Sequence, residues 1–394
     1  MRKIIISYLK QHPKTVRFVW DTARLLLQFI GLFIPIKKER IIFCSYGGRS
    51  FNDSPKALYD KILKMDFFSD YDLIWAFDNP NNYHVKRGKK IKIDTITFFY
   101  YLLSSGVWIS NSGMDRGIGL KRKRTIKIET WHGTPLKKIL GDENQTALGG
   151  KKISFKGKPD KNTIRCSQSD FDRQLFARLF NADIKSILKS DLPRNDVLVE
   201  NNFNVDKIKH KLGIPLDKKV ILYTPTYREY LIDENYNTYI APPLDMKLLQ
   251  EKLSKEYVFL VRAHYAVTKS LNLEENDFVY DVSDYPDINH LYLISDILLS
   301  DYSSTYFDYS ILDRPILCFA YDLEEYQAKR GLYLNLDKVL PCRIDKTEQE
   351  LIDSIMNLNY DEACKKTHVF HKKYAPYAGE SCKIILNVLM TRLK

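Results

Sequence analysis

Short, continuously apolar runs that alternate with helical patterns dominate this 394-residue sequence. Such runs predict strands buried on both faces, and helices between them predict parallel sheets covered by helices. The predicted strands form two series: 40–46, 72–77, 106–110, 125–130 and 163–167, and then 219–224, 257–262, 278–282, 296–300 and 315–319. The helical patterns between them include 170–180, 245–253, 287–295 and 305–312.

A polar break near residues 200–204 separates the two series and predicts two Rossmann-like α/β domains that face each other across a cleft. The expected division is a leader over 1–38, an N-terminal Rossmann-like domain over 39–200, a C-terminal Rossmann-like domain over 201–345, and helices over 346–394 that pack back onto the first domain. Because open parallel sheets bind ligands beyond the carboxyl ends of their strands, the loops directly after strands are the candidate sites.

The first 40 residues carry nine basic and two acidic residues, whereas the net charge of the whole chain is +12. Concentrated positive charge predicts an anionic partner, either nucleic acid or lipid headgroups. The apolar stretch 25–36 within this leader is shorter than the ~20 residues that a spanning helix needs. It predicts a helix lying in the membrane surface, with an ordinary core helix as the alternative.

Cysteine and histidine usage excludes several classes of site. The six cysteines are scattered without a CxxC pair, which favours reduced thiols in a cytoplasmic protein. The eight histidines include no HExxH motif, so we expect a transfer reaction without a metal or another cofactor. A GxxxxGK[ST] loop is also absent, which disfavours a nucleoside triphosphatase.

Two candidate segments offer a base and a phosphate-binding group. His132 stands in the sequence ETWHGTPLK, directly after a predicted strand, where a histidine could accept a proton from an attacking hydroxyl. Thr226 and Arg228 follow the strand 219–224, and a hydroxyl and a guanidinium can both bind phosphate oxygens. Taken alone, each segment more commonly has no catalytic role: the histidine would be a structural residue at a turn, and the arginine would be solvated.

Two further segments could stabilise a diphosphate. Arg262 and His264 lie two residues apart at a strand end, where they could neutralise charge on a leaving phosphate. The segment SDYSSTYFD at 300–308 follows an apolar strand and opens a helix, where hydroxyls and backbone amides can bind phosphate. The alternative for Arg262 and His264 is a pair of surface residues without a function. The alternative for the segment 300–308 is a helix that is simply capped at its N-terminus.

Together these segments resemble the CDP-glycerol glycerophosphotransferase family of teichoic-acid enzymes. The resemblance rests on WHGTPLK, DLPRND, YTPTYR, RAHY, SDYPDINHLYLISDILLSDYSSTYFDY, RPILCFAYDLEEY and KRGLY, in order, from about residue 40 to residue 335. It implies a GT-B-like fold and transfer of glycerol phosphate from CDP-glycerol, with release of CMP, to a polyprenyl-diphosphate-linked acceptor. The enzyme would sit peripherally on the cytoplasmic face of the bacterial membrane. The partners would then be CDP-glycerol, the lipid-linked acceptor and an anionic membrane surface, and no nucleic acid.

The resemblance also assigns roles to residues that match its motifs. His132 matches the general base, and His264 matches a histidine that assists at the donor diphosphate. The segment 284–288 resembles a loop near the cytidine. The matching donor-site positions are Thr226, Arg228, Arg262, Asp301, Ser303, Ser304, Thr305 and Asp308.

Two departures from the family pattern concern specificity. Residues 334–342 read LNLDKVLPC where the family has an acidic strand and a Pro-Gly-Pro turn, and DLPRND replaces GYPRND. Ribitol phosphate or another CDP-linked polyol is therefore an alternative donor unit. A GT-B sugar transferase that uses a nucleotide sugar and a non-catalytic lipid- or nucleic-acid-binding protein are further alternatives. Polymerases of the family often carry extra N-terminal sequence, which favours a primase or short-chain transferase here.

Overall fold

The computed structural model describes residues 13–115, 117–144, 160–200, 203–226, 228, 243–263 and 276–394. The chain divides into two compact units, which are Met1–His132 with Asp160–Arg165 and Cys382–Lys394, and Gly133–Pro159 with Cys166–Ser381. This division differs from the expected ranges because the chain changes unit several times. The last helix, α16 (Ser381–Leu393), falls largely in the first unit, whereas α14 (Glu348–Met356) and α15 (Tyr360–Tyr374) fall in the second.

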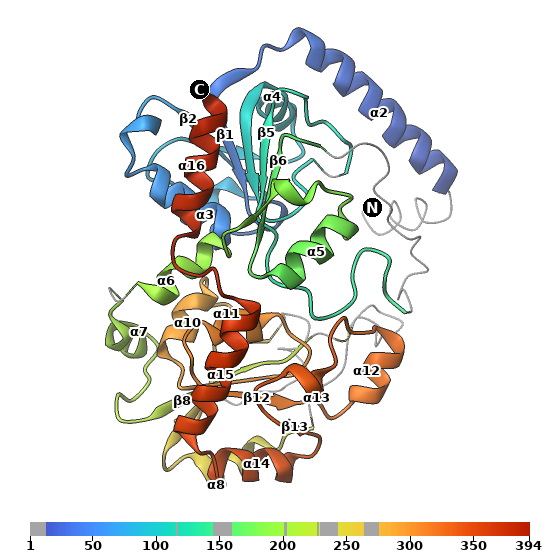
Figure 1. Ribbon diagram of the computed structural model, residues 1–394. Helices are drawn as coiled ribbons and strands as arrows, with labels where there is room; N and C mark the ends of the chain where they lie inside the picture. Colours follow the sequence, from blue (N-terminus) through green and yellow to red (C-terminus); the bar gives the residue numbers. More distant parts are fainter. Residues whose placement is uncertain are drawn as a thin grey trace. The chain divides into compact units, whose positions relative to one another are not determined.

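The first sheet has the strand order β3-β2-β1-β4-β5-β6-β7. Figure 1 labels its strands β2, β1, β5 and β6. Strands β1 to β6 pair in parallel, and Cys44 of β1 lies opposite Ser110 of β4. The strands are β1 (Lys37–Cys44), β2 (Asp72–Phe77), β3 (Lys89–Lys92), β4 (Ser105–Ser110), β5 (Ile126–Glu129), β6 (Thr163–Ser167) and β7 (Ile187–Lys189). The chain starts at β1, moves outward to β3 and returns on the other side of β1, so the topological switch point lies between β1 and β4.

The second sheet repeats this winding, with the order β10-β9-β8-β11-β12-β13 and parallel pairing throughout. Its switch point lies between β8 and β11, where Thr224 lies opposite Ser300. The strands are β8 (Lys219–Thr224), β9 (Tyr257–Val261), β10 (Val279–Asp281), β11 (Ile297–Ser300), β12 (Ile316–Phe319) and β13 (Ile344–Asp345). Two parallel Rossmann-like sheets confirm the predicted α/β fold class.

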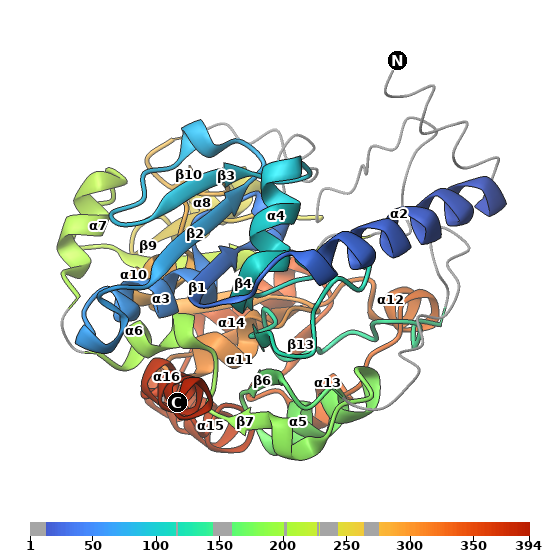
Figure 2. The same cartoon turned by 90° about the horizontal axis from the view of Figure 1, so that it is seen from above.

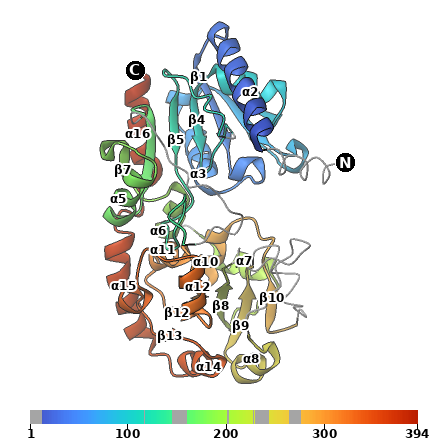
Figure 3. The ribbon, with the colours of Figure 1, turned by 90° about the vertical axis from the view of Figure 1, so that its right-hand side faces the viewer.

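Helices cover the sheets and connect successive strands. Besides α16, those described in the first unit are α2 (Pro13–Phe33), α3 (Asp53–Ile62) and α4 (Ile96–Ser104). Those of the second unit also include α5 (Asp170–Leu179), α6 (Asp196–Val199), α7 (Val205–Lys211), α8 (Met246–Leu253), α10 (Ile288–Ile294), α11 (Thr305–Ser310), α12 (Leu323–Lys329) and α13 (Leu336–Val339). Figure 3 shows α8 and α14 side by side in that unit.

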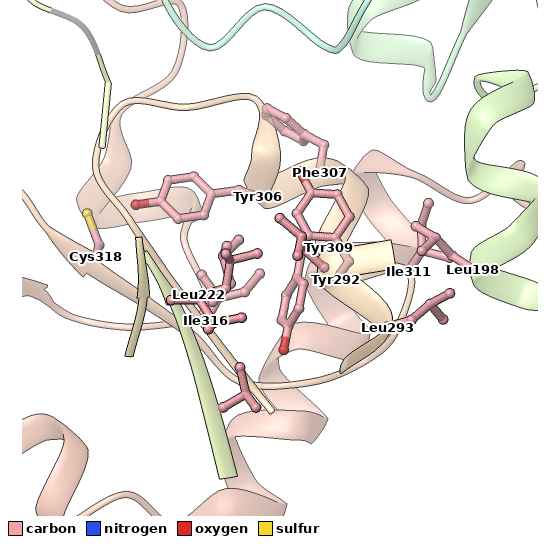
Figure 4. Close-up of a cluster of buried hydrophobic side chains, with 14 of the residues drawn as sticks. Leu198, Leu222, Tyr292, Leu293, Tyr306, Phe307, Tyr309, Ile311, Ile316 and Cys318 are labelled. Carbon is pink, nitrogen blue, oxygen red and sulfur yellow. The ribbon is translucent and has the colours of Figure 1, made fainter. Parts of the chain in front are cut away.

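The core of the second unit is rich in tyrosine. Tyr292, Tyr306 and Tyr309 are fully buried around Leu222 of β8 (Figure 4). Two of these hydroxyls form hydrogen bonds with the backbone: Tyr306 donates to the Asp301 carbonyl at 3.0 Å, and Tyr309 donates to the Ser295 carbonyl at 2.9 Å. The aromatic core therefore also fixes the backbone on either side of β11.

The predicted leader helix exists as α2, and only part of its surface is covered. Figure 2 shows its C-terminal part beside α4. Leu27 and Ile34 pack against the buried core of the first unit, and Gly31 lies so close to Leu103 that an added Cβ would approach its side chain to 3.1 Å. Six large apolar side chains stay exposed: Leu25, Leu26, Phe29, Ile30, Leu32 and Phe33. Within the described part of the chain, no helix is both long and apolar enough to cross a bilayer.

Replacing Leu222 with alanine should lower the free energy of unfolding by about 2–5 kcal/mol, because the cavity forms in a closely packed core. The matched control is Leu216→Ala, since the Leu216 side chain is 48% exposed. Urea titration of both variants checks this expectation, and equal losses in the two would contradict it.

Candidate active site

The first switch point brings the end of β1 together with the end of β4. Tyr46 and Asn111 follow these strands, and the Tyr46 backbone N–H donates to Asn111 Oδ1 at 2.8 Å. Asn111 is fully buried, and no partner for its Nδ2 is found among the described residues. A buried donor of this kind at a switch point is suited to a ligand.

His132 lies at this switch point, where the chain emerges from β5. Its Nδ1 is 3.0 Å from the Asn111 carbonyl oxygen, and its ring stacks on Trp131 with the centroids 4.5 Å apart. Since a carbonyl oxygen only accepts, Nδ1 must carry the proton, and in the neutral ring Nε2 carries the lone pair. This tautomer is the one that a general base needs.

Three non-glycine residues near His132 adopt left-handed backbone conformations. The φ angles are 48° at Tyr46, 63° at Asp53 and 58° at Trp131. The Tyr46 hydroxyl donates to Asp53 Oδ2 at 2.7 Å, and the Tyr46 ring lies 5.9 Å from the His132 ring. Such conformations cost about 1–3 kcal/mol each and concentrate at functional sites, where surrounding contacts enforce them.

The second switch point carries a cluster of hydroxyl groups. Thr224 Oγ1 lies 3.0 Å from Ser300 Oγ and 3.2 Å from Thr305 Oγ1. Ser303 Oγ accepts from the Thr305 backbone N–H at 3.2 Å, and Ser304 makes no side-chain cap to α11. Thr226 Oγ1 is buried, with no partner among the described residues. The cluster thus offers hydroxyl groups of the kind that bind phosphate oxygens.

Arg228 is held by two carboxylates and is only 3% exposed. Its guanidinium lies 2.8 Å from Asp301 Oδ2 and, through Nε, 2.8 Å from Asp322 Oδ2, with Tyr302 facing it at 4.8 Å from the ring centroid. Burial alone would lower the pKa of Arg228, but the two carboxylates raise it instead. Asp301 also accepts from the Thr226 backbone N–H at 2.9 Å, so this cluster positions Thr226.

Asp308 is also buried, and its carboxylate binds three neighbouring donors. Oδ1 accepts from Gln168 Nε2 at 3.0 Å and from Asn195 Nδ2 at 2.9 Å, while Oδ2 pairs with Arg194 at 2.7 Å. Arg194 and Asn195 belong to DLPRND, so this motif and the 300–308 segment share one network. Asp308 therefore positions α11.

The glycine of HGTP lies against the hydroxyl-rich segment within the second unit. A Cβ at Gly133 would come within 2.8 Å of Ser304 Oγ, and Gly133 has a φ of 141°. Only glycine allows this close approach. The following residue, Thr134, donates to Gln168 Oε1 at 2.9 Å, and Gln168 binds Asp308.

Arg262 connects the end of β9 to the segment that resembles a cytidine-binding loop. Its Nη1 donates to the Tyr285 carbonyl at 2.6 Å and to the Val282 carbonyl at 3.3 Å. His264, the other member of this predicted pair, lies outside the described residues.

Among the described residues, the structure places Thr226, Ser303, Ser304 and Thr305 around the switch point of the second sheet. The carboxylates of Asp301 and Asp308 bind other protein groups, and Arg262 lies at the end of β9. Sequence reasoning did not select Tyr46, Asn111, Gln168, Asn195 or Asp322 as site residues. Asn111 was detectable, because it follows a buried strand as directly as Asp301 does. The others depend on contacts between segments far apart in the chain.

Comparison with known proteins gives a consistent result. Residues 26–390 match the family model of CDP-Glycerol:Poly(glycerophosphate) glycerophosphotransferase. The teichoic acid poly(glycerol phosphate) polymerase of Bacillus spizizenii is 33% identical, over 93% of this chain and 95% of that protein. The teichoic acid glycerol-phosphate transferase of Staphylococcus aureus is 35% identical, over 86% of this chain and 89% of its own. The chain spans about half the length of another relative, the polymerase of Bacillus subtilis, which is 32% identical over 91% of this chain.

Solved structures support the same assignment. The wall teichoic acid polymerase TagF superposes with a TM-score of 0.85 at 30% identity, covering 100% of this chain and 98% of that chain. A UDP-GlcNAc 2-epimerase from Neisseria meningitidis, at 13% identity and a TM-score of 0.54, shares the fold alone, over 89% of this chain and 100% of that chain. The chain thus belongs to the CDP-glycerol:poly(glycerophosphate) glycerophosphotransferase family, as the sequence motifs predicted, and it is an enzyme of that class.

Proposed function

We propose that this enzyme transfers glycerol phosphate from CDP-glycerol to a teichoic-acid acceptor linked to polyprenyl diphosphate, with release of CMP. The observation that carries the proposal is the bond from His132 Nδ1 to the Asn111 carbonyl, because it fixes the tautomer of a base at a sheet switch point. The relatives named above are teichoic-acid polymerases and transferases, and a variant of TagF has been soaked with CDPG.

In the proposed reaction, His132 Nε2 takes the proton from an acceptor hydroxyl. The freed oxygen attacks the phosphorus that carries glycerol, and a new phosphodiester bond forms. The bond from that phosphorus to the bridging oxygen breaks, and CMP leaves with the electron pair. The proposed groups that bind the donor diphosphate are Thr226, Ser303, Ser304, Thr305, Arg262 and His264. We assign Arg228, Asp301 and Asp308 to positioning these groups, since their charges are already paired within the protein.

Donor identity is tested by incubating the enzyme with lipid-linked acceptor and CDP-glycerol, CDP-ribitol or a UDP-sugar in separate reactions. CMP release that is fastest from CDP-glycerol supports the proposal. Preferred turnover of CDP-ribitol would move the assignment to a different polyol, and release of UDP would contradict it. Product mass analysis of the same reactions gives the number of units added, which distinguishes a primase from a polymerase.

His132→Ala should lower turnover by about 10²–10⁴-fold with donor binding retained, because the general base is lost. His84→Ala is the matched control, as His84 is exposed in the same unit. Steady-state CMP release and calorimetric binding of CDP-glycerol measure the two effects. Activity within threefold of wild type would remove His132 from this role.

Ser304→Ala should weaken CDP-glycerol binding about tenfold or more, since a hydrogen bond to a charged group contributes about 1.5–3 kcal/mol. The thermal midpoint should not change, because the hydroxyl does not cap α11. Ser254→Ala, at the end of α8, serves as control. Unchanged donor affinity and turnover together would place the diphosphate elsewhere.

We further propose that α2 attaches the enzyme peripherally to the cytoplasmic face of the membrane, where a lipid-linked acceptor is held. Its exposed apolar side chains and the basic residues of the leader supply the two contributions that stable surface attachment generally needs. Deleting residues 1–36 should lower vesicle binding and activity on a long-chain lipid acceptor, and largely spare activity on a short-chain soluble acceptor. The deletion would also remove core contacts of Leu27 and Ile34, so point variants give a sharper test.

Leu25→Glu/Phe29→Glu should reduce co-sedimentation with anionic vesicles and activity on a long-chain lipid acceptor, because both side chains are more than half exposed on α2. Activity on a short-chain soluble acceptor should largely persist. The control Leu216→Glu/Met356→Glu places the same charges at exposed apolar positions of the second unit. Binding of the wild type should fall as salt rises. Equal sedimentation of both double variants with wild type would contradict membrane attachment through α2.

A further inference from the structure

Two histidines and one aspartate meet where α15 packs on α11, at a position that the transfer reaction does not use. His368 Nδ1 lies 2.8 Å from Asp313 Oδ2, and His371 Nδ1 lies 2.9 Å from Asp313 Oδ1. One ligand atom from each of the three residues lies within 4.8 Å of the other two. Figure 1 shows α11 and α15 side by side in the second unit.

The backbone already holds the three groups in register. His368 and His371 are three residues apart on the 15-residue helix α15, so they lie on the same face. Asp313 follows α11 in a left-handed conformation with a φ of 53°, and its N–H donates to the Ser310 carbonyl at 2.9 Å. A metal ion would therefore find its ligands on two segments that are fixed by contacts of their own.

The donor set suits a borderline divalent ion such as Zn²⁺. Two imidazole nitrogens and one carboxylate oxygen are a common set of protein ligands for zinc, with bonds of about 2.0–2.2 Å. Without metal, each Nδ1 carries a proton toward the carboxylate; a neutral imidazole can carry that proton on Nε2 instead and present the Nδ1 lone pair. Water can complete the coordination, because His368 is 49% and Asp313 38% exposed, while His371 is 12% exposed.

We propose that Asp313, His368 and His371 form a Zn²⁺ site that links α15 to the end of α11. Asp313 follows the C-terminal end of α11, whereas Ser303, Ser304 and Thr305 lie at its N-terminal end. The ion would thus stabilise the helix that carries Asp308 without joining the reaction. The sequence motif that indicates this site is HVFH at 368–371, but its carboxylate is 55 residues away and only the fold supplies it.

The test uses the full chain stripped of metal and titrated with Zn²⁺ by calorimetry. We expect one equivalent to bind, and the thermal midpoint to rise with Zn²⁺ concentration, because the ion binds the folded state. His368→Gln and Asp313→Asn should each weaken binding at least tenfold. His210→Gln, which removes an exposed histidine of α7, should bind like wild type.

Co²⁺ titration gives a second readout that does not depend on enzymatic activity. A visible absorption band that saturates at one equivalent in wild type and in His210→Gln, and is lost in His368→Gln, supports the site. Far-ultraviolet circular dichroism establishes that each variant is folded. The proposal is overturned if the wild type binds neither ion stoichiometrically, or if folded His368→Gln binds as tightly as wild type.

Discussion

The arrangement of the second unit depends on the hydrogen bonds and the ion pair that the buried Asp308 carboxylate forms. A buried charge is stable only when donors satisfy it, and here Gln168, Arg194 and Asn195 do so. These donors come from the segment after β6 and from DLPRND, so one carboxylate ties both to α11. Gln168 also binds Thr134, the residue after Gly133, and this extends the network to HGTP. The hydroxyl-rich segment thus takes its position from a buried carboxylate that binds three donors of the protein itself.

The cluster around Arg228 shows the same division between supporting and exposed groups. Arg228 is paired with Asp301 and Asp322, and Asp301 holds the Thr226 backbone. Removing one partner of a buried ion pair leaves an uncompensated charge, which typically costs about 3–5 kcal/mol. A charged residue in a motif can therefore contribute to a site by holding other residues in place. The presence of such a residue in a motif does not by itself make it a ligand for phosphate.

In the first unit, strained backbone conformations lie around His132. Tyr46, Asp53 and Trp131 keep left-handed conformations close to His132, and the Tyr46–Asn111 and Tyr46–Asp53 hydrogen bonds hold part of this geometry. The same unit carries α2, where the partly buried Leu27 packs against the core, as does Ile34 directly after the helix, while Phe29 and Leu32 are exposed. α2 thus packs on the core with one side, as the alternative of an ordinary core helix expects, and exposes apolar side chains on the other, while attachment to a membrane stays a prediction.

The sequence alone determined the two α/β series, the family and most of the segments that line the switch points. Continuous apolar runs are strong local signals, and ten of the strands lie within three residues of their predicted bounds. The strands that went unpredicted, β3, β7 and β13, have two to four residues each, and three of the four in β3 are lysines, so they carry little apolar signal. Only the tertiary structure decided which motif residues are supports, that Asn111 orients His132, and that Asp313 meets His368 and His371. Those outcomes depend on contacts between residues that are 21 to 140 positions apart in the sequence. Local sequence patterns do not predict contacts between residues so far apart in the chain.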